Sequence, residues 1–295
     1  MFRLLYRQRR RILFTAFFTT MALMLFVVQT YWAAAVGDFP AWISYTSLAL
    51  TSLIVAICVG LLTALLILVF PNWRMIAELF ALTLFVNVTL DMLFPSLFET
   101  TYIGGFLQLA VYFALFALMY GEVMDRFRIW VDHHSTRSFN SPKPADELWA
   151  ELVPGEAALD THWDSLLCAL EPDAEEDGAY DARYALGASV FEHQTMTILE
   201  KDAPHYAKYH HVGDVNPNNR NLVEGTFAIR ITPLEKGGCK VTLEGRRSLL
   251  LLRVALLMWF DDYLGDQTDH IRARHLGRRD WSETGRFRRK VGQFA

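Results

Sequence analysis

The sequence has few cysteines and none of the common catalytic signatures. Its three cysteines, Cys58, Cys168 and Cys239, are an odd number and lack the CxxC spacing of zinc and redox sites. We therefore expect buried thiols, no metal site and no disulfide framework. The patterns HExxH, GxSxG, Walker A and GxGxxG do not occur either. On these grounds the sequence assigns no catalytic residue and no cofactor.

Charge is also scarce, but only in one half of the chain. Between Ile12 and Met124 almost every ionisable residue is missing, whereas the sequence from Asp125 onward has the composition of a polar domain. The hydrophobic content of 53% and the mean hydropathy of +0.19 are therefore averages over two unlike parts. This break divides the chain into a membrane half and a globular half.

The apolar half contains four runs long enough to cross a bilayer, whose hydrocarbon core needs about 20 apolar residues per helix. Short turn-forming segments at Pro40, Pro71 and Pro95 separate these runs, so neighbouring helices should run antiparallel. The sequence thus predicts a membrane region over residues 1–124, with transmembrane helices at about 12–36, 42–70, 74–94 and 102–124.

Arginine residues predict the orientation of these helices. Five precede the first run, one lies in the second turn and two follow the fourth run, whereas the other two turns carry only acidic residues. The positive-inside rule then places the N-terminus and everything after Met124 in the cytoplasm. We expect a multi-pass protein of the inner (plasma) membrane. The arginines are Arg3, Arg7, Arg9, Arg10, Arg11, Arg74, Arg126 and Arg128.

A few polar side chains interrupt the membrane helices. Asp91 and Asn87 lie four residues apart on one face of the third helix, and Gln108 lies at a similar depth in the fourth. They indicate either a small polar site near the outer surface or interhelical hydrogen bonds, with Asp91 reaching the interface. Glu78, near the inner end of the third helix, is expected to be interfacial. No set of charges spans the bilayer, which argues against a transporter or pump.

Residues 125–137 are expected to continue the fourth helix as an interfacial stalk, because aromatic and charged residues are mixed there. His133 and His134 are consecutive in this segment. Two consecutive helical positions do not converge on one metal ion, so solvated histidines are expected.

The rest of the chain has strand signals without βαβ alternation, which is typical of an α+β domain. Ala145–Leu152 is predicted to be a short helix, and Gly237-Gly238 closes a hairpin because glycine tolerates positive φ. One long amphipathic helix is expected from about Leu249 to His275. The expected strands are 162–170, 179–186, 193–200, 205–212, 221–233 and 239–244, after a short strand at 138–140.

Two segments resemble the START-like (SRPBCC) superfamily, which includes polyketide cyclases, lipid-transfer domains and pollen-allergen-like carriers. Residues 139–149 (FNSPKPADELW) resemble its opening strand and first helix, and residues 231–243 (ITPLEKGGCKVTL) are similar to its late hairpin. The resemblance covers about residues 137–279. It implies a helix-grip domain over residues 138–279, in which an antiparallel sheet surrounds a C-terminal helix with an apolar cavity between them. It carries over no catalytic residue.

The hollow between that helix and the sheet is the predicted ligand site. Leu249 to Phe260 is apolar on nearly every side, so this segment needs a second cover besides the sheet. The bilayer surface, the membrane helices, another protein or the domain's own loops would each serve. The residues expected to line the cavity are Tyr184, Phe227, Leu252, Leu256, Trp259 and Tyr263.

Residues 280–295 are expected to form a basic tail. In a membrane-tethered chain, anionic lipid head groups are the nearest partner, at about 1 kcal/mol per basic residue close to the surface. Nucleic acid would use similar chemistry but does not suit the anchor. A solvated, disordered tail is the alternative. The residues expected at the membrane surface are Arg278, Arg279, Arg286, Arg288, Arg289 and Lys290.

Histidines in the strands offer no catalytic set. His210 and His211 are adjacent in an extended chain, so their side chains point to opposite faces. We expect these histidines, together with His162, His193 and His205, to be surface or hydrogen-bonded residues.

The function expected from the sequence is membrane-anchored binding or transfer of a hydrophobic ligand of lipid, quinone or polyprenyl type. The alternatives are a cyclase- or aromatase-like enzyme on a hydrophobic substrate and a non-catalytic accessory subunit of a membrane complex. A paired histidine and carboxylate in the cavity would favour the enzyme. A side-chain-filled interior with an exposed apolar helix face would favour the accessory subunit. The expected partners are membrane lipids, a hydrophobic small molecule and a membrane protein.

Overall fold

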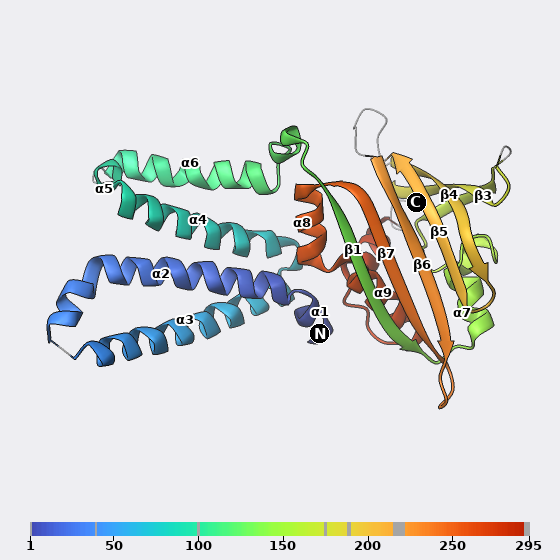
Figure 1. Ribbon diagram of the computed structural model, residues 1–295, viewed down its shortest axis with the longest axis horizontal. Helices are drawn as coiled ribbons and strands as arrows, with labels where there is room; N and C mark the ends of the chain where they lie inside the picture. The colour runs from blue at the N-terminus through green and yellow to red at the C-terminus, as the bar shows by residue number, and fades with distance from the viewer. Residues whose placement is uncertain are drawn as a thin grey trace. The chain divides into compact units, whose positions relative to one another are not determined.

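A computed structural model describes residues 2–38, 40–98, 101–173, 176–187, 190–214 and 222–291. The chain divides into two compact units, Met1–Phe127 and Arg128–Ala295. Each unit has its own architecture, helical in the first and a sheet with helices in the second (Figure 1).

The first unit consists of helices joined by short turns. Four of its segments are long and apolar enough to cross a membrane: Arg9–Thr30, Trp42–Val69, Pro71–Leu93 and Tyr102–Met119. Within this unit α2 packs against α3 and α4, and α4 packs against α6. The four predicted membrane helices are thus confirmed as elements. The bounds are α1 Phe2–Arg7, α2 Arg9–Asp38, α3 Ala41–Val69, α4 Arg74–Leu93, α5 Pro95–Phe98 and α6 Thr101–Met119, with a 3-10 turn η1 at Pro71–Trp73.

Polar side chains join α2 to α4 near both ends of the helices. Arg11 Nη1 lies 2.6 Å from Glu78 Oε1, and the Glu78 side chain is 0% exposed. The Tyr120 hydroxyl donates to the same carboxylate. An arginine from the neighbouring helix thus allows the charge of Glu78 to be buried within the protein, and its interfacial depth stays a prediction. Towards the other end, Gln29 Nε2 donates to Asp91 Oδ2 at 3.5 Å, an interhelical bond that was predicted for Asn87 and Gln108 but not for Asp91.

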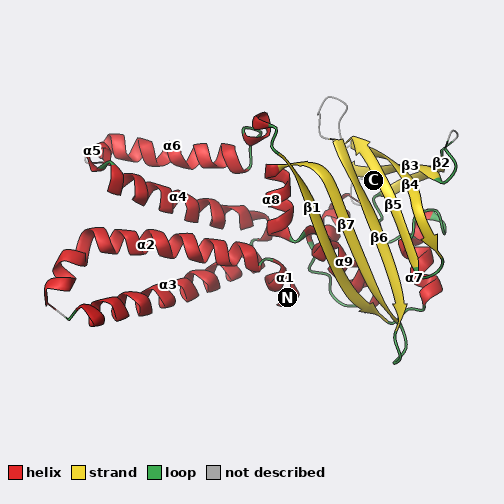
Figure 2. Cartoon of the chain, in the orientation of Figure 1, coloured by secondary structure: helices red, strands yellow, loops and turns green. Residues whose placement is uncertain are grey.

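The second unit is a seven-stranded antiparallel sheet in the order β1-β7-β6-β5-β4-β3-β2, with α9 crossing one face (Figures 1 and 2). We call the face that α9 covers the inner face. This arrangement confirms the α+β helix-grip fold. The bounds are β1 Trp130–Ser141, β2 Leu167–Pro172, β3 Ala179–Gly187, β4 Val190–Asp202, β5 Tyr206–Asp214, β6 Leu222–Pro233 and β7 Cys239–Leu251, with α7 Ala145–Leu152, α8 Leu252–Asp261, α9 Tyr263–His275, α10 Glu283–Val291 and 3-10 turns η2 Met124–Phe127 and η3 Leu159–Thr161.

The predicted helical stalk is wrong. Helix α6 ends at Met119, and the chain is a strand from Trp130 onward. Gly121 marks this end, since a Cβ atom there would lie only 2.6 Å from the Ala117 carbonyl oxygen. Strand β1 pairs with β7 along its length, so the backbone groups of β1 form hydrogen bonds with the neighbouring strand. His133 and His134 consequently point to opposite faces of a strand.

The predicted closing helix is two helices. Strand β7 runs on to Leu251, α8 follows, and Asp262 then adopts a left-handed conformation with φ of 47° before α9 begins. Aspartate tolerates this region better than most residues. Arg137 on β1 holds its carboxylate with two hydrogen bonds, Nε to Oδ2 at 3.2 Å and Nη2 to Oδ1 at 2.5 Å. A contact 125 residues away in the sequence therefore fixes the break.

The structure confirms one further local prediction and corrects two others. The hairpin between β6 and β7 is confirmed, with Gly237 at φ of 87° and Gly238 at φ of 74°. Strand β2 begins at Leu167 rather than at residue 162, because 159–161 form a 3-10 turn. Buried thiols are wrong for Cys58, on the surface of α3, and for Cys168, on the edge strand β2; both are exposed, whereas Cys239 is buried.

The hydrophobic core lies at one end of the inner face, near the β6–β7 hairpin. There α9 contributes Leu264 and Ile271, and α7 contributes its apolar side against the strands. We call this region the hairpin end. Its buried residues include Phe139, Leu148, Trp149, Leu152, Ile229, Ile231, Val241, Leu243, Leu264 and Ile271.

Candidate ligand-binding site

Further along the same strands the inner face changes character. Strand pairing aligns Tyr209, Phe227 and Gly245 in one row across β5, β6 and β7, and His211, Gly225 and Arg247 in the next row on the same face. Tyr184 of β3 and Tyr263 of α9 lie beside these rows. We call this region the Arg247 end. It comprises Tyr184, Tyr209, His211, Phe227, Arg247 and Tyr263.

Two glycines shape the Arg247 end. A Cβ atom on Gly245 would lie 3.7 Å from the Phe227 ring, an ordinary contact distance, so a longer side chain there would extend toward the ring. A Cβ atom on Gly225 would lie 2.2 Å from the Arg246 carbonyl oxygen, which excludes any larger residue. His211 and Arg247 are two strands apart, so their backbones are about 10 Å apart, and Gly225 between them contributes no side chain.

Aromatic contacts hold the remaining side chains in place. The rings of Tyr209 and Phe227 are 5.6 Å apart, and those of Tyr209 and His211 are 6.4 Å apart. The Arg247 guanidinium carbon lies 5.3 Å from the centre of the Tyr263 ring, within reach of a cation–π interaction. The Arg247 end is therefore ordered by ring contacts from two strands and from α9.

The interior is not sealed around these rings. Tyr184, Tyr209 and Phe227 pack against buried core clusters, yet each keeps part of its surface accessible to solvent. Tyr263, opposite them on α9, is 38% exposed. Side chains in a closed core at crystal-like density would be covered on every side. The Arg247 end is therefore the less completely covered end of the inner face, and most of its side chains are aromatic.

Several polar groups at the Arg247 end have no protein partner among the described residues. His211 is only 7% exposed, and its Nδ1 atom lacks a hydrogen bond. Across the described residues, Arg247 forms no ion pair with a carboxylate, and the hydroxyls of Tyr184 and Tyr209 form no hydrogen bond. Most buried polar groups in proteins are paired, so the unpaired Nδ1 atom of the buried His211 is unusual.

Burial sets the protonation of these groups. Burial, aided by the positive charge of Arg247 and by His210, lowers the pKa of His211 to about 4, so the imidazole is neutral at pH 7. Burial raises the pKa of Tyr209, and Asp164 adds to the effect. Burial likewise raises the pKa of Tyr184 well above its ordinary value. The site thus presents two neutral phenols, a neutral imidazole and one cation.

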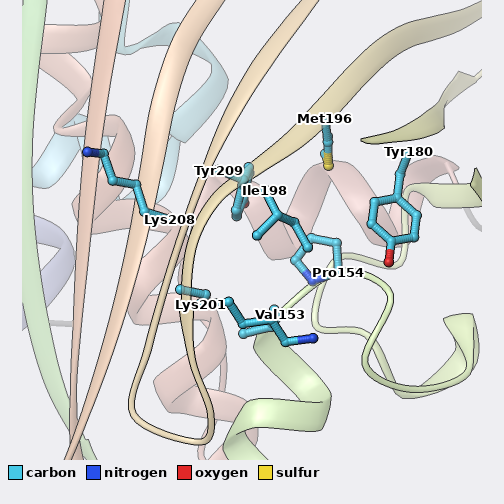
Figure 3. A pocket seen from close by; sticks show the side chains of 9 residues that line it. Val153, Pro154, Tyr180, Met196, Ile198, Lys201, Lys208 and Tyr209 are labelled. Carbon is cyan, nitrogen blue, oxygen red and sulfur yellow. The ribbon is translucent and has the colours of Figure 1, made fainter. Parts of the chain in front are cut away.

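A small cavity lies under β4 and β5, with Tyr209 in its wall (Figure 3). Its volume of about 10 Å³ holds about one water molecule, which is far too little for a hydrophobic ligand. A ligand larger than a water molecule would therefore have to displace side chains here or bind at the partly exposed rings of the Arg247 end. The cavity is lined by Val153, Pro154, Tyr180, Met196, Ile198, Lys201, Ala207, Lys208 and Tyr209.

The structure brings together three of the six predicted lining residues. Tyr184, Phe227 and Tyr263 meet at the Arg247 end. The others lie on α8, which the break at Asp262 separates from α9; Leu256 is 41% exposed and Trp259 is 44% exposed. The remaining α8 residue is Leu252, which is partly exposed.

Sequence reasoning left Tyr209 open between cavity lining and sheet packing, and it missed His211 and Arg247 as part of this site. Each stands an even number of residues from an inner-face position of its own strand, so strand parity carried a usable signal. The expectation that His211 would be a surface or hydrogen-bonded residue is wrong, because its strand turns it inward and Gly225 leaves it without a neighbour to bond.

Histidine–carboxylate pairs occur on the outer face of the sheet. His134 Nε2 lies 3.1 Å from Glu244, and His210 Nε2 lies 3.5 Å from Glu224. Both carboxylates line an open polar depression of about 510 Å³ on that face. At the Arg247 end, no such pair is present among the residues that the structure describes. The feature that would favour an enzyme therefore has no counterpart at the candidate site.

The C-terminal segment is docked on the domain rather than extended. Asp266 caps α10 by accepting hydrogen bonds from the backbone N–H groups of Glu283 at 3.0 Å and Thr284 at 2.7 Å. Arg288 is 8% exposed, stacks on Trp163 and pairs with Asp164 at 2.7 Å. A disordered tail is therefore wrong up to Val291.

Arg288 must also be removed from the predicted membrane-surface set, because its guanidinium is used inside the domain. Arg286 is partly buried and pairs with Glu283 at 3.1 Å. Arg278, Arg279 and Arg289 are exposed. The side chain of Lys290 lies outside the described part of the chain.

No protein-family model and no curated protein matches this sequence. Solved structures similar to about half of the chain include Ara h 8.0201, with a TM-score of 0.38 and 14% identity over 50% of this chain and 99% of that one. XoxI from Bacillus cereus gives a TM-score of 0.37 and 11% identity over 48% and 95%. A norcoclaurine synthase mutant from Thalictrum, in complex with a transition-state analogue, gives 0.33 and 15% over 50% and 97%. Such values carry no conclusion about a shared ligand or reaction.

Proposed function

We propose that this protein is a membrane-anchored carrier or sensor that binds a hydrophobic ligand at the Arg247 end of its helix-grip domain. One observation supports the proposal: aromatic rings from β3, β5, β6 and α9 gather at the Arg247 end and remain partly exposed. The ligand is of lipid, quinone or polyprenyl type, since four apolar helices tether the domain to the bilayer in which such compounds dissolve.

Burial alone supplies enough free energy for such binding. Each buried methylene contributes about 0.8 kcal/mol, so a chain of about twelve carbons gains roughly 10 kcal/mol before the costs of association. Catalysis is not required by this reading. The polar groups at the site then set which end of the ligand enters.

The proposal places the domain in the cytoplasm, at the inner membrane. Its support is the excess of arginine before α2, in the turn before α4 and after α6, together with the positive-inside rule. The exposed Arg278, Arg279 and Arg289 would then face anionic lipid head groups. Membrane lipids are thus both the proposed neighbours and the proposed source of the ligand.

A second candidate function, that of an accessory subunit, is favoured by helix α8. Leu256 and Trp259 are exposed on it, and apolar side chains of this size on one short helix suit contact with a membrane-protein partner. Ligand binding and partner binding use different surfaces, so one protein can do both.

The test is native mass spectrometry of the full chain released from lipid nanodiscs. The wild type should retain a small hydrophobic molecule. Gly245→Leu projects a side chain into the Arg247 end and should abolish retention, and Tyr263→Trp should reduce it from the opposite wall. Ala228→Leu is the matched control, because Ala228 pairs opposite Glu244 on the outer face.

The outcomes separate clearly. Retention in Gly245→Leu equal to that in the wild type would place the ligand elsewhere. A wild type without any bound hydrophobic molecule, even after incubation with excess lipid, would overturn the proposal. Thermal unfolding of each variant shows whether a loss of retention reflects a lost fold.

A further inference from the structure

We infer that the ligand carries an anionic head group, a carboxylate or a phosphate, which binds between Arg247 and His211. The inference rests on the proposed function and adds the chemical class of the ligand. It comes from the balance of hydrogen-bond donors and acceptors at the Arg247 end, which the protein itself leaves unmatched.

Arg247 supplies the positive charge at the site. Its strand position turns it to the inner face, and the Tyr263 ring lies 5.3 Å from its guanidinium carbon. The nearby acids are already engaged, since Asp164 pairs with Arg288 at 2.7 Å and Glu192 accepts a hydrogen bond from Gln194. A planar guanidinium has five N–H donors and no acceptor, so its complement is an oxygen anion.

His211 supplies a buried imidazole to the site. Nine-tenths of its side chain is buried, and its Nδ1 atom has no hydrogen-bond partner. A neutral imidazole offers one N–H donor and one acceptor. The imidazole N–H and the two phenol hydroxyls of Tyr184 and Tyr209 give the Arg247 end three neutral donors besides Arg247. An acceptor-rich head group satisfies them together, whereas an alcohol supplies only one oxygen.

Gly225 separates His211 from Arg247 on the inner face. It lies between His211 and Arg247 in the same cross-strand row and places no side chain between them. A head group seated there reaches the donors on both sides. Its hydrocarbon chain then lies against Phe227 and Tyr209, the next row of the same face.

The experiment uses the full chain in nanodiscs of phosphatidylcholine, whose zwitterionic surface does not favour either charge. Three photoreactive probes share one diazirine-bearing twelve-carbon chain and end in a carboxylate, a phosphate or an alcohol. Cross-linked peptides are mapped by mass spectrometry. We expect labelling of the strands around Phe227, with at least tenfold less by the alcohol than by one of the anions, since hydrogen bonds to charged groups are the stronger ones.

Two neighbouring arginines provide a matched pair of variants. Arg247→Gln should reduce the anion preference to less than about twofold. Arg246→Gln should leave the preference unchanged, because Arg246 points to the outer face and pairs with Glu244 at 3.0 Å. Arg247→Lys should restore part of the preference, since it keeps the charge but loses the planar fork. If Arg247→Gln fails to fold, His211→Phe provides a second variant, expected to weaken the anion preference severalfold.

Each result bears on one claim. Equal labelling of the inner face by all three probes overturns the anionic head group but leaves the proposed function standing. A preference that survives Arg247→Gln also overturns the inference. Labelling of the inner face by none of the probes overturns the proposed function. The ratio of phosphate to carboxylate labelling identifies which anion the site prefers.

Discussion

The hairpin end and the Arg247 end belong to one inner face and are built on the same strands, yet their side chains differ in how completely they are covered. At the hairpin end, Ile229 and Leu243 are covered by Leu264 and Ile271 of α9. A few residues further along β6 and β7, the side chains become glycine, an aromatic ring and an arginine, and the cover is incomplete. The difference shows which part of the interior supports the fold and which part is free to bind.

Buried charge shows the same contrast. Near the hairpin end, Glu151 is bound by His275 at 2.9 Å and by Lys143 at 2.7 Å. Burial opposes its ionisation, but these hydrogen bonds outweigh burial and lower the pKa of Glu151 to about 2. At the Arg247 end, His211 has no comparable partner. His275 also has an unbonded Nδ1 atom but binds Glu151 through Nε2, whereas His211 has no hydrogen bond to the described residues, and such a buried group costs stability.

The largest expected effect is at the hairpin end. Leu243→Ala removes a side chain that is 1% exposed and leaves a cavity in the core. We expect the free energy of unfolding to fall by about 2–5 kcal/mol. Urea unfolding of the full chain, followed by tryptophan fluorescence, measures this change. A loss below about 1 kcal/mol would contradict a closed core at this end.

The second effect is that of the buried carboxylate. Glu151→Gln should lower the free energy of unfolding by about 3 kcal/mol at pH 7, because the ionised form is stabilised in the folded state. In the wild type this contribution is present above pH 4.5 and is lost as the pH falls towards about 2. The variant should lack that part of the pH dependence, which urea unfolding at several pH values would show.

The third effect tests the Arg247 end by pH. His211 has a pKa near 6.5 when unfolded and about 4 when folded, so the unfolded state binds the additional proton between these values. The ligand-free protein should therefore lose up to about 3 kcal/mol as the pH falls from 6.5 to about 4, with no change above 6.5. His211→Phe should remove this slope. An identical slope in the variant would assign the titration to another group.

The smallest effect is expected at a hydroxyl. Tyr184→Phe removes a group with no hydrogen bond to the described residues, so the free energy of unfolding should change by less than about 0.5 kcal/mol. The same urea experiment applies. A loss above about 1 kcal/mol would show that the hydroxyl has a partner in the folded, ligand-free protein.

Local signals in the sequence were sufficient for much of the fold. Apolar runs predicted the membrane helices, and Gly237-Gly238 predicted the hairpin, because each depends on residues close together in the chain. The break at Asp262 depends on Arg137, and the burial of Glu78 depends on Arg11. Strand β1 is polar along most of its length and is recognised only by its pairing with β7. Such long-range partners have no local signature.

The candidate site was predictable in part for the same reason. Aromatic residues in strands and in the closing helix predicted Tyr184, Phe227 and Tyr263, whereas the α8 residues were assigned on the assumption of one continuous helix. His211 and Arg247 become a pair only when β5, β6 and β7 are placed in register. Registers of this kind join residues more than thirty positions apart.

The most direct test is a crystal structure of the full chain with 12-bromododecanoic acid, in which anomalous scattering locates the bromine atom. We expect a bromine peak against Phe227 and Tyr209, with the carboxylate within hydrogen-bond distance of Arg247. Bromine peaks found only on the outer face of the sheet, on α8 or among the membrane helices would contradict it.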